Sequence, residues 1–72
     1  MTITNQQLKE LREAQSFGTK KEFNELLEKY TGVIAKSYMG FSYYDEFGNY
    51  VGDSNTCTIH DILRNIPCKV VD

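Results

Sequence analysis

The chain has 72 residues, with 40% hydrophobic and 25% charged side chains and a formal net charge of −2. A chain of this length forms one domain whose small core leaves little stability to offset strained or desolvated catalytic groups. The slight acidity excludes a mimic of nucleic acid, and the sequence contains neither a secretion signal nor an apolar run that could span a membrane.

We therefore expect one compact domain over residues 1–72, cytoplasmic and not attached to a membrane. The two cysteines, without a secretion signal, fit reduced thiols. Small domains commonly gain stability by self-association, so a homodimer is also compatible with this sequence.

Two amphipathic helices are predicted in the N-terminal half. Thr4 begins a Thr-x-x-Gln capping box, which starts a helix over residues 4–16. Gly18 is expected to close this helix in the left-handed conformation that glycine tolerates. Thr19 begins a Thr-x-x-Glu capping box, which predicts a second helix over residues 20–30.

The segment after the second helix is ambiguous. Residues 33–39 contain a β-branched pair and a tyrosine, which favour a strand. Such a strand would place Val33 on one face and Ile34 and Lys36 on the other. Ile34 and Tyr38 are also four residues apart, so a third helix is the alternative. We prefer the strand.

The C-terminal half predicts a hairpin and a helix. Residues 41–52 have β-rich, aromatic ends around the turn-forming residues 45–49. The sequence Thr-Ile-His-Asp predicts a helix over residues 58–66, which must end before Pro67. Residues 68–71 are a candidate fourth strand of the same sheet.

These elements predict an α+β fold, with a three-stranded antiparallel sheet packed against two N-terminal helices and one C-terminal helix. Apolar residues that recur at helical spacing should supply most of the core. They are Leu8, Leu11, Phe23, Leu26, Leu27, Ile59, Ile62, Leu63 and Ile66.

Cys57, His60 and Cys68 are the residues closest to a metal or thiol site. Cys57 and His60 are one helical turn apart, a spacing that suits zinc or a nucleophile with its base. A structural zinc site usually has four Cys or His ligands, and a hydrolase also needs an oxyanion hole and an orienting partner. We therefore expect no metal, no cofactor and no enzymatic activity.

The first half resembles the helix-turn-helix family of DNA-binding repressors. The resemblance covers residues 8–14 and 19–27, which correspond to the first two helices of that fold. It implies a basic recognition helix next, where residues 33–38 carry one cation. A degenerate helix-turn-helix regulator is the alternative function, with phosphate contacts from Lys20, Lys21, Lys29 and Lys36.

The aromatic hairpin is the most informative feature for function. Six aromatic residues lie within residues 38–50, and strand alternation allows about half of them to face a core. Tyrosine is enriched among the residues that carry affinity at protein interfaces, and acidic neighbours suit a basic partner surface. The candidate partner-binding residues are Tyr43, Tyr44, Asp45, Glu46, Phe47 and Tyr50.

The leading functional hypothesis is a small protein-binding module that occupies a site on a partner protein. Small acidic chains of this kind are common in phages and mobile elements, where they inhibit host or defence proteins. We therefore expect a protein partner with a basic surface rather than a nucleic acid. Packing of the same aromatic residues on the helices or in a homodimer contact is the alternative explanation.

Overall fold

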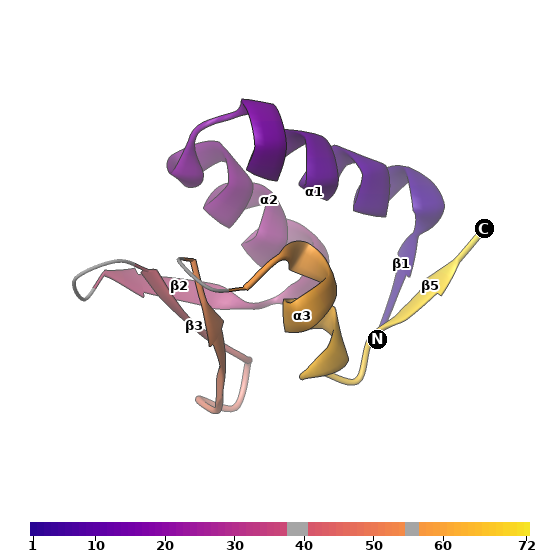
Figure 1. Ribbon diagram of the computed structural model, residues 1–72. Coiled ribbons are helices and arrows are strands. Elements are labelled where there is room, and N and C mark those ends of the chain that lie inside the picture. Colours follow the sequence, from indigo (N-terminus) through magenta and orange to yellow (C-terminus); the bar gives the residue numbers. More distant parts are fainter. Residues whose placement is uncertain (38–40, 55–56) are drawn as a thin grey trace.

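In the computed structural model, residues 1–37, 41–54 and 57–72 are described, and they form three helices and five short strands (Figure 1). The α+β fold is confirmed. In chain order the elements are β1 (Thr2–Thr4), α1 (Asn5–Phe17), α2 (Lys20–Thr31), β2 (Ile34–Ser37), β3 (Phe41–Tyr44), β4 (Tyr50–Asp53), α3 (Ile59–Arg64) and β5 (Lys69–Val71).

The helices begin where the capping residues predicted. The Thr4 hydroxyl accepts from the Gln7 N–H, and the Gln7 side chain accepts from the Thr4 N–H, which completes the box at α1. Thr19 caps α2 by accepting from the Glu22 N–H. These bonds satisfy N–H groups that the first helical turn leaves without a partner.

Gly18 does not have the left-handed conformation that we expected. Its φ of −91° and ψ of −176° are extended, so the prediction is wrong. A Cβ at this position would lie 2.9 Å from both the Ala14 carbonyl oxygen and Glu22 Oε2. Glycine is favoured here because the chain folds back closely on the last turn of α1, whereas Gly32, with φ 78°, is the residue that ends its helix in the left-handed conformation.

The segment after α2 is a strand. β2 covers Ile34–Ser37, while Tyr38 and Met39 of the predicted strand lie outside the described residues. β2, β3 and β4 form an antiparallel sheet in that order, with Ala35 opposite Tyr43 and Tyr43 opposite Gly52. The preferred strand assignment and the hairpin are thus confirmed.

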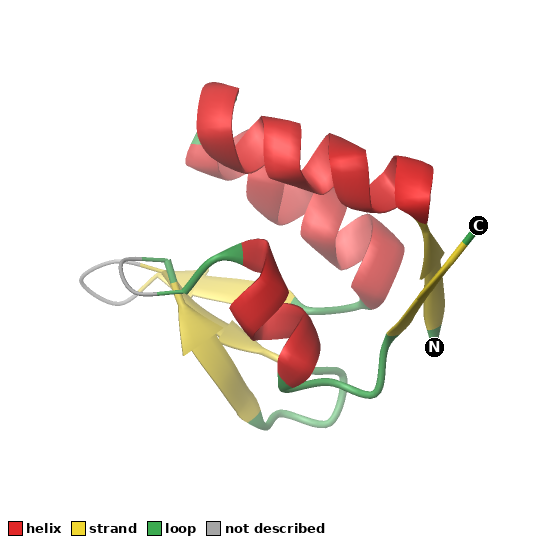
Figure 2. Cartoon of the chain, turned by 45° about the vertical axis from the view of Figure 1, so that its right-hand side comes forward, coloured by secondary structure: helices red, strands yellow, loops and turns green. Residues whose placement is uncertain are grey.

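The C-terminal strand does not join this sheet. β5 instead pairs in parallel with β1, a strand that the sequence did not predict, and Ile3 stands opposite Val70. In Figures 1 and 2 the β1–β5 ribbon lies on the far side of α3 from the three-stranded sheet. The ribbon brings the first and last segments of the described chain side by side, with the two termini at its opposite ends.

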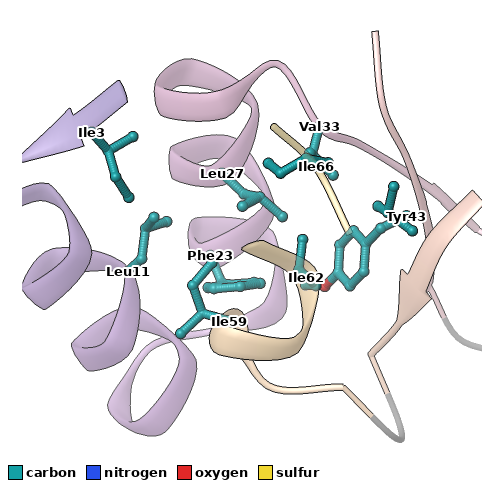
Figure 3. Close-up of a cluster of buried hydrophobic side chains, with 10 residues drawn as sticks. Ile3, Leu11, Phe23, Leu27, Val33, Tyr43, Ile59, Ile62 and Ile66 are labelled. Atoms are coloured by element: carbon teal, nitrogen blue, oxygen red, sulfur yellow. The ribbon is translucent and has the colours of Figure 1, made fainter. Parts of the chain in front are cut away.

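One hydrophobic core lies between the helices and one face of the sheet (Figure 3). Leu11, Phe23, Leu27, Ile59, Ile62 and Ile66 are buried as predicted, whereas Leu8, Leu26 and Leu63 are only partly buried. The core also contains residues that helical spacing could not reveal, namely Ile3, Val33, Tyr43 and Val51. Each of these belongs to a strand or immediately precedes one.

Candidate functional site

The sheet face that points away from the helices is partly apolar. Strand alternation buries Val33, Tyr43 and Val51, and it leaves Ile34 and Tyr50 exposed by 43% and 58% of their surface. Ile34 stands opposite Tyr44, and Tyr44 stands opposite Tyr50, so an apolar row crosses all three strands. We call the residues Ile34, Lys36, Tyr44, Tyr50 and Asp53 the outer sheet face.

Contacts within the outer sheet face hold the aromatic rings in place. Tyr44 and Tyr50 pack edge to face, with ring centroids 5.8 Å apart and planes at 74°. Lys36 Nζ lies 4.9 Å from the centroid of the Tyr44 ring, a cation–π distance. Neither strand alternation nor composition alone could show that Lys36 meets Tyr44, because this contact depends on the β2–β3 register.

Tyr50 connects this row to Asp53. The Tyr50 hydroxyl donates to Asp53 Oδ2 at 3.4 Å. Partial burial and the nearby Asp53 carboxylate raise the pKa of Tyr50, so its hydroxyl stays protonated and available as a donor. Asp53 was not among the predicted site residues, and its position two strands from Lys36 became evident only from the sheet.

The hairpin tip between β3 and β4 is fixed by one carboxylate. Asp45 Oδ1 accepts from the Phe47 N–H at 2.9 Å and from the Asn49 N–H at 2.8 Å, and Oδ2 accepts from Asn49 Nδ2. These bonds, above all the one from the Asn49 backbone, hold the pKa of Asp45 below its ordinary value. Gly48 supplies the positive φ of 85° that the turn requires.

Phe47 projects from this fixed tip. Its side chain is 82% exposed, although phenylalanine is normally buried. The Glu46 side chain beside it packs over Gly32 at the end of α2. It lies so close that a Cβ on Gly32 would be 2.9 Å from Glu46 Cγ. The tip thus presents an aromatic ring beside the exposed Glu46 and the half-buried Asp45 on an ordered loop.

Tyr43 does not belong to this surface. It is only 2% exposed, and Figure 3 shows its ring pointing from β3 into the core. Its hydroxyl donates to Asn24 Oδ1 at 2.8 Å, and its ring packs edge to face on Phe23. The prediction that Tyr43 contacts a partner is therefore wrong, because alternation along β3 directs Tyr43 inward and Tyr44 outward.

The structure does not assemble Cys57, His60 and Cys68 into a metal site. Among the described residues, no three His, Cys, Asp or Glu side chains are placed to hold an ion. Both thiols are partly buried and are not joined in a disulfide. Burial raises the pKa of the Cys68 thiol, which lowers its reactivity as a nucleophile at neutral pH.

His60 lies on an open hollow of about 840 Å³. This hollow runs between α3 and the β1–β5 ribbon, and its walls include Leu8, Leu63 and Cys68. Of the described residues that line the hollow, none is acidic. His60 therefore has no carboxylate from that lining to orient it as a general base.

The arrangement expected of a helix-turn-helix regulator is also not formed at residues 34–37. These residues form strand β2 directly after α2, in the place where that fold needs its recognition helix. The resemblance thus ends with the second helix.

In the residues that the structure describes, no helix combines the length and apolarity needed to cross a membrane. Comparison of the chain with protein-family models, with curated proteins and with solved structures finds no match in any of the three. Its function has to be inferred from the chemistry of its own surface.

Proposed function

We propose that this protein is a non-enzymatic binding module that docks on a basic surface of a partner protein. The docking surface consists of the outer sheet face together with Glu46 and Phe47 of the hairpin tip. Four of the six residues predicted from the sequence, Tyr44, Glu46, Phe47 and Tyr50, contribute side chains to it. Asp45 contributes by fixing the conformation of the tip. Tyr43 is not part of the surface, whereas Ile34 and Lys36 are added to it.

The exposure of Phe47 on a rigid tip carries this proposal. A side chain that is 82% exposed gains nothing from burial in the free protein, whereas insertion into a partner pocket would remove its apolar surface from water. The bonds to Asp45 order the tip before binding, which lowers the conformational entropy lost on association. Such anchors dominate the affinity of many protein interfaces.

The charges around the surface favour a basic partner. Asp53 accepts from Tyr50 of the aromatic row, Asp45 and Glu46 follow Tyr44 directly in the chain, and Lys36 is the cation that lies over one of the rings. The surrounding acidic residues would steer a basic surface towards the aromatic row, and the same charges would repel the phosphates of nucleic acid. A phosphate-binding role is therefore the weaker explanation of this surface.

The protonation states of these groups support binding rather than acid–base catalysis. A general acid or base is most effective when its pKa lies near the working pH. The local contacts move the pKa of Tyr50 upward and that of Asp45 downward, away from neutrality in both cases. At neutral pH these groups serve as a fixed donor and a fixed acceptor.

The test is affinity capture from a bacterial lysate with tagged wild-type protein and the variant Phe47→Ser. Phe17→Ser is the matched control, because Phe17 is 89% exposed at the end of α1 and lies outside the docking surface. We expect a stoichiometric protein partner with the wild type and the control, and its loss or a drop in affinity of about tenfold or more with Phe47→Ser.

Nuclease treatment distinguishes the alternatives. A partner that survives nuclease and needs Phe47 supports docking on a protein, and inhibition of that partner's activity would support a role as an inhibitor of a host or defence protein. Equal capture by wild type and Phe47→Ser would contradict the proposal. Recovery of nucleic acid, or of partners lost on nuclease treatment, would favour the DNA-binding alternative.

A further inference from the structure

The two edges of the three-stranded sheet are not equally protected. At the β4 edge, Asn65 Nδ2 donates to the Val51 carbonyl oxygen at 2.9 Å, and the β3–β4 register shifts between Tyr43 and Tyr44. Side-chain bonds of this kind and bulges block the addition of a further strand. At β2, by contrast, no other strand of the described chain pairs with the outer edge, and the β2–β3 register is regular.

The direction of the backbone groups along β2 follows from the pairing of β3. The Phe41 N–H donates to Ser54 Oγ, and the Phe41 carbonyl accepts from the Ser54 N–H. The backbone N–H and C=O of Phe41 therefore point away from β2. Because these directions alternate along a strand, the backbone N–H and C=O of Ser42 point towards β2, where Ser42 pairs with Lys36. Ala35, between two residues bonded to β3, directs its N–H and C=O to the open edge.

A groove runs along this edge beside α2. It has a volume of about 410 Å³, and its apolar lining consists of Ile34, Ala35 and Phe41. Its other wall is a stripe on α2, whose members are spaced so that they share one helix face. They are Lys21, Asn24, Glu25 and Glu28.

α2 and β2 run side by side in opposite directions. The chain reverses at Gly32, and Lys20 at the start of α2 places Nζ 5.8 Å from the ring of Phe41, which pairs with the last residue of β2. The middle of the α2 stripe therefore lies near the middle of β2. A two-fold axis through the open edge at Ala35 would thus also pass close to the centre of the stripe.

We infer that a second copy of this chain occupies this groove, by antiparallel pairing of β2 with β2 of the second copy. The charges of α2 are complementary for this arrangement at Lys21 and Glu28, whereas the exposed Glu25 side chains of the two copies lie near the axis and turn their carboxylates to solvent. A two-fold axis near residues 24 and 25 places Lys21 of each copy against Glu28 of the other, which gives two identical ion pairs. Dimers of this symmetry use the same patch on both subunits.

The strand register follows from the same axis. Ala35 faces Ala35 of the second copy, and their outward N–H and C=O groups bond to each other. Ile34 then lies opposite Lys36 of the second copy, whose aliphatic stem covers its exposed apolar surface. The two sheets become continuous, and the two outer sheet faces point to the same side.

The decisive experiment uses charge exchange and sedimentation equilibrium over about 10–500 µM protein, a range suited to a modest interface. We expect wild type to dimerise. Lys21→Glu and Glu28→Lys should each raise the dimer dissociation constant by about tenfold or more, because each places two like-charged pairs at the interface. A 1:1 mixture of the two variants should dimerise again, because one ion pair of the mixed dimer is then the wild-type pair of Lys21 with Glu28 and the other joins the two introduced side chains, which carry opposite charges.

Lys29→Glu is the matched control, since it makes the same charge change on α2 outside the groove lining. It should dimerise as wild type does. A wild type that stays monomeric over the whole range overturns the inference and leaves the groove to an extended peptide of another protein. Single variants that dimerise normally, or a mixture that does not recover, also overturn it. None of these outcomes depends on the partner proposed for the docking surface.

Discussion

Tyr43 and Tyr44 are neighbours in the sequence with opposite roles. Tyr43 fills the core against Phe23 and Asn24 of α2, whereas Tyr44 lies in the row of the outer sheet face. Burial, reinforced by the nearby Asp53 carboxylate, raises the pKa of Tyr43 to about 12. Its hydroxyl therefore remains a hydrogen-bond donor to Asn24 at any pH at which the protein would be studied.

Substitution should separate these roles. Tyr43→Ala removes a fully buried ring and should lower the free energy of unfolding by about 3–5 kcal/mol. Domains of this length have a total of about 4–11 kcal/mol, so the variant should lose a large share of its stability. Tyr44→Ala loses one edge-to-face contact and should cost about 1 kcal/mol. Urea denaturation measures both, and equal losses would contradict the inward and outward assignments.

Asp45 links the order of the hairpin tip to pH. Its folded-state pKa lies below the ordinary 3.8, so its ionised form stabilises the fold above about pH 4. That stabilisation is lost as the pH falls below 3.8 and through the lowered folded-state pKa. Protonation should therefore loosen the tip that carries Phe47.

We expect Asp45→Ala to melt at a lower temperature than wild type at pH 7, and this difference to shrink towards about pH 2.5. Asp45→Asn keeps an acceptor but cannot titrate, so the melting temperature of this variant should vary less with pH over the same range. Thermal unfolding followed by circular dichroism measures all three proteins. A difference between wild type and Asp45→Ala that stays constant with pH would show that the carboxylate does not stabilise the turn.

At the scale of elements, α3 shows how a very short helix is held. It has six residues, fewer than an isolated helix needs in water. Thr58 and Asp61 form a complete capping box, and burial of Ile59 and Ile62 anchors one face. A further bond comes from α1, since Gln15 Oε1 accepts from the Ile59 N–H at 3.0 Å.

Gln15 is thus a remote cap that ties α1 to the start of α3. Gln15→Ala should lower the free energy of unfolding by about 1 kcal/mol, because the first N–H of α3 loses its partner. Gln6→Ala is the control, at an exposed position of the same helix, and should cost less than about 0.5 kcal/mol. Denaturant unfolding measures both, and equal effects would show that the bond from Gln15 does not stabilise α3, since alanine forms helix more readily than glutamine.

At the scale of the whole molecule, the ends of the chain complete the core. Ile3 in β1 is 1% exposed and packs in the cluster that also contains Leu11 and Leu27. β1 is held in place by β5, and Asn5 hydrogen-bonds Asp72 beside the ribbon. The C-terminal residues therefore stabilise the core indirectly, by keeping Ile3 in position.

Ile3→Ala should therefore lower the free energy of unfolding by about 2–4 kcal/mol. Val70→Ala, the residue opposite Ile3 in β5, should cost less than about 1 kcal/mol because Val70 is 40% exposed. Chemical denaturation of both variants provides the comparison. A small effect of Ile3→Ala would mean that the ribbon is not part of the cooperative unit.

The sequence by itself determined the elements whose signals are local. Threonine caps placed the starts of all three helices, and turn residues located the hairpin. Apolar spacing identified five buried helix residues and also Ile66, although α3 ends at Arg64, two residues before the predicted end. These features depend on contacts between residues a few positions apart. The pattern of charged and aromatic side chains also contains most of the residues of the proposed docking surface.

Only the tertiary structure decided the features that join distant segments. These include the pairing of β1 with β5, the inward direction of Tyr43, and the meeting of Lys36 with Tyr44. A strand's partner and register are not encoded in its own few residues, and a shift of one residue exchanges the two faces. For the same reason the open edge of β2 and the charged stripe beside it became evident only once the sheet was assembled.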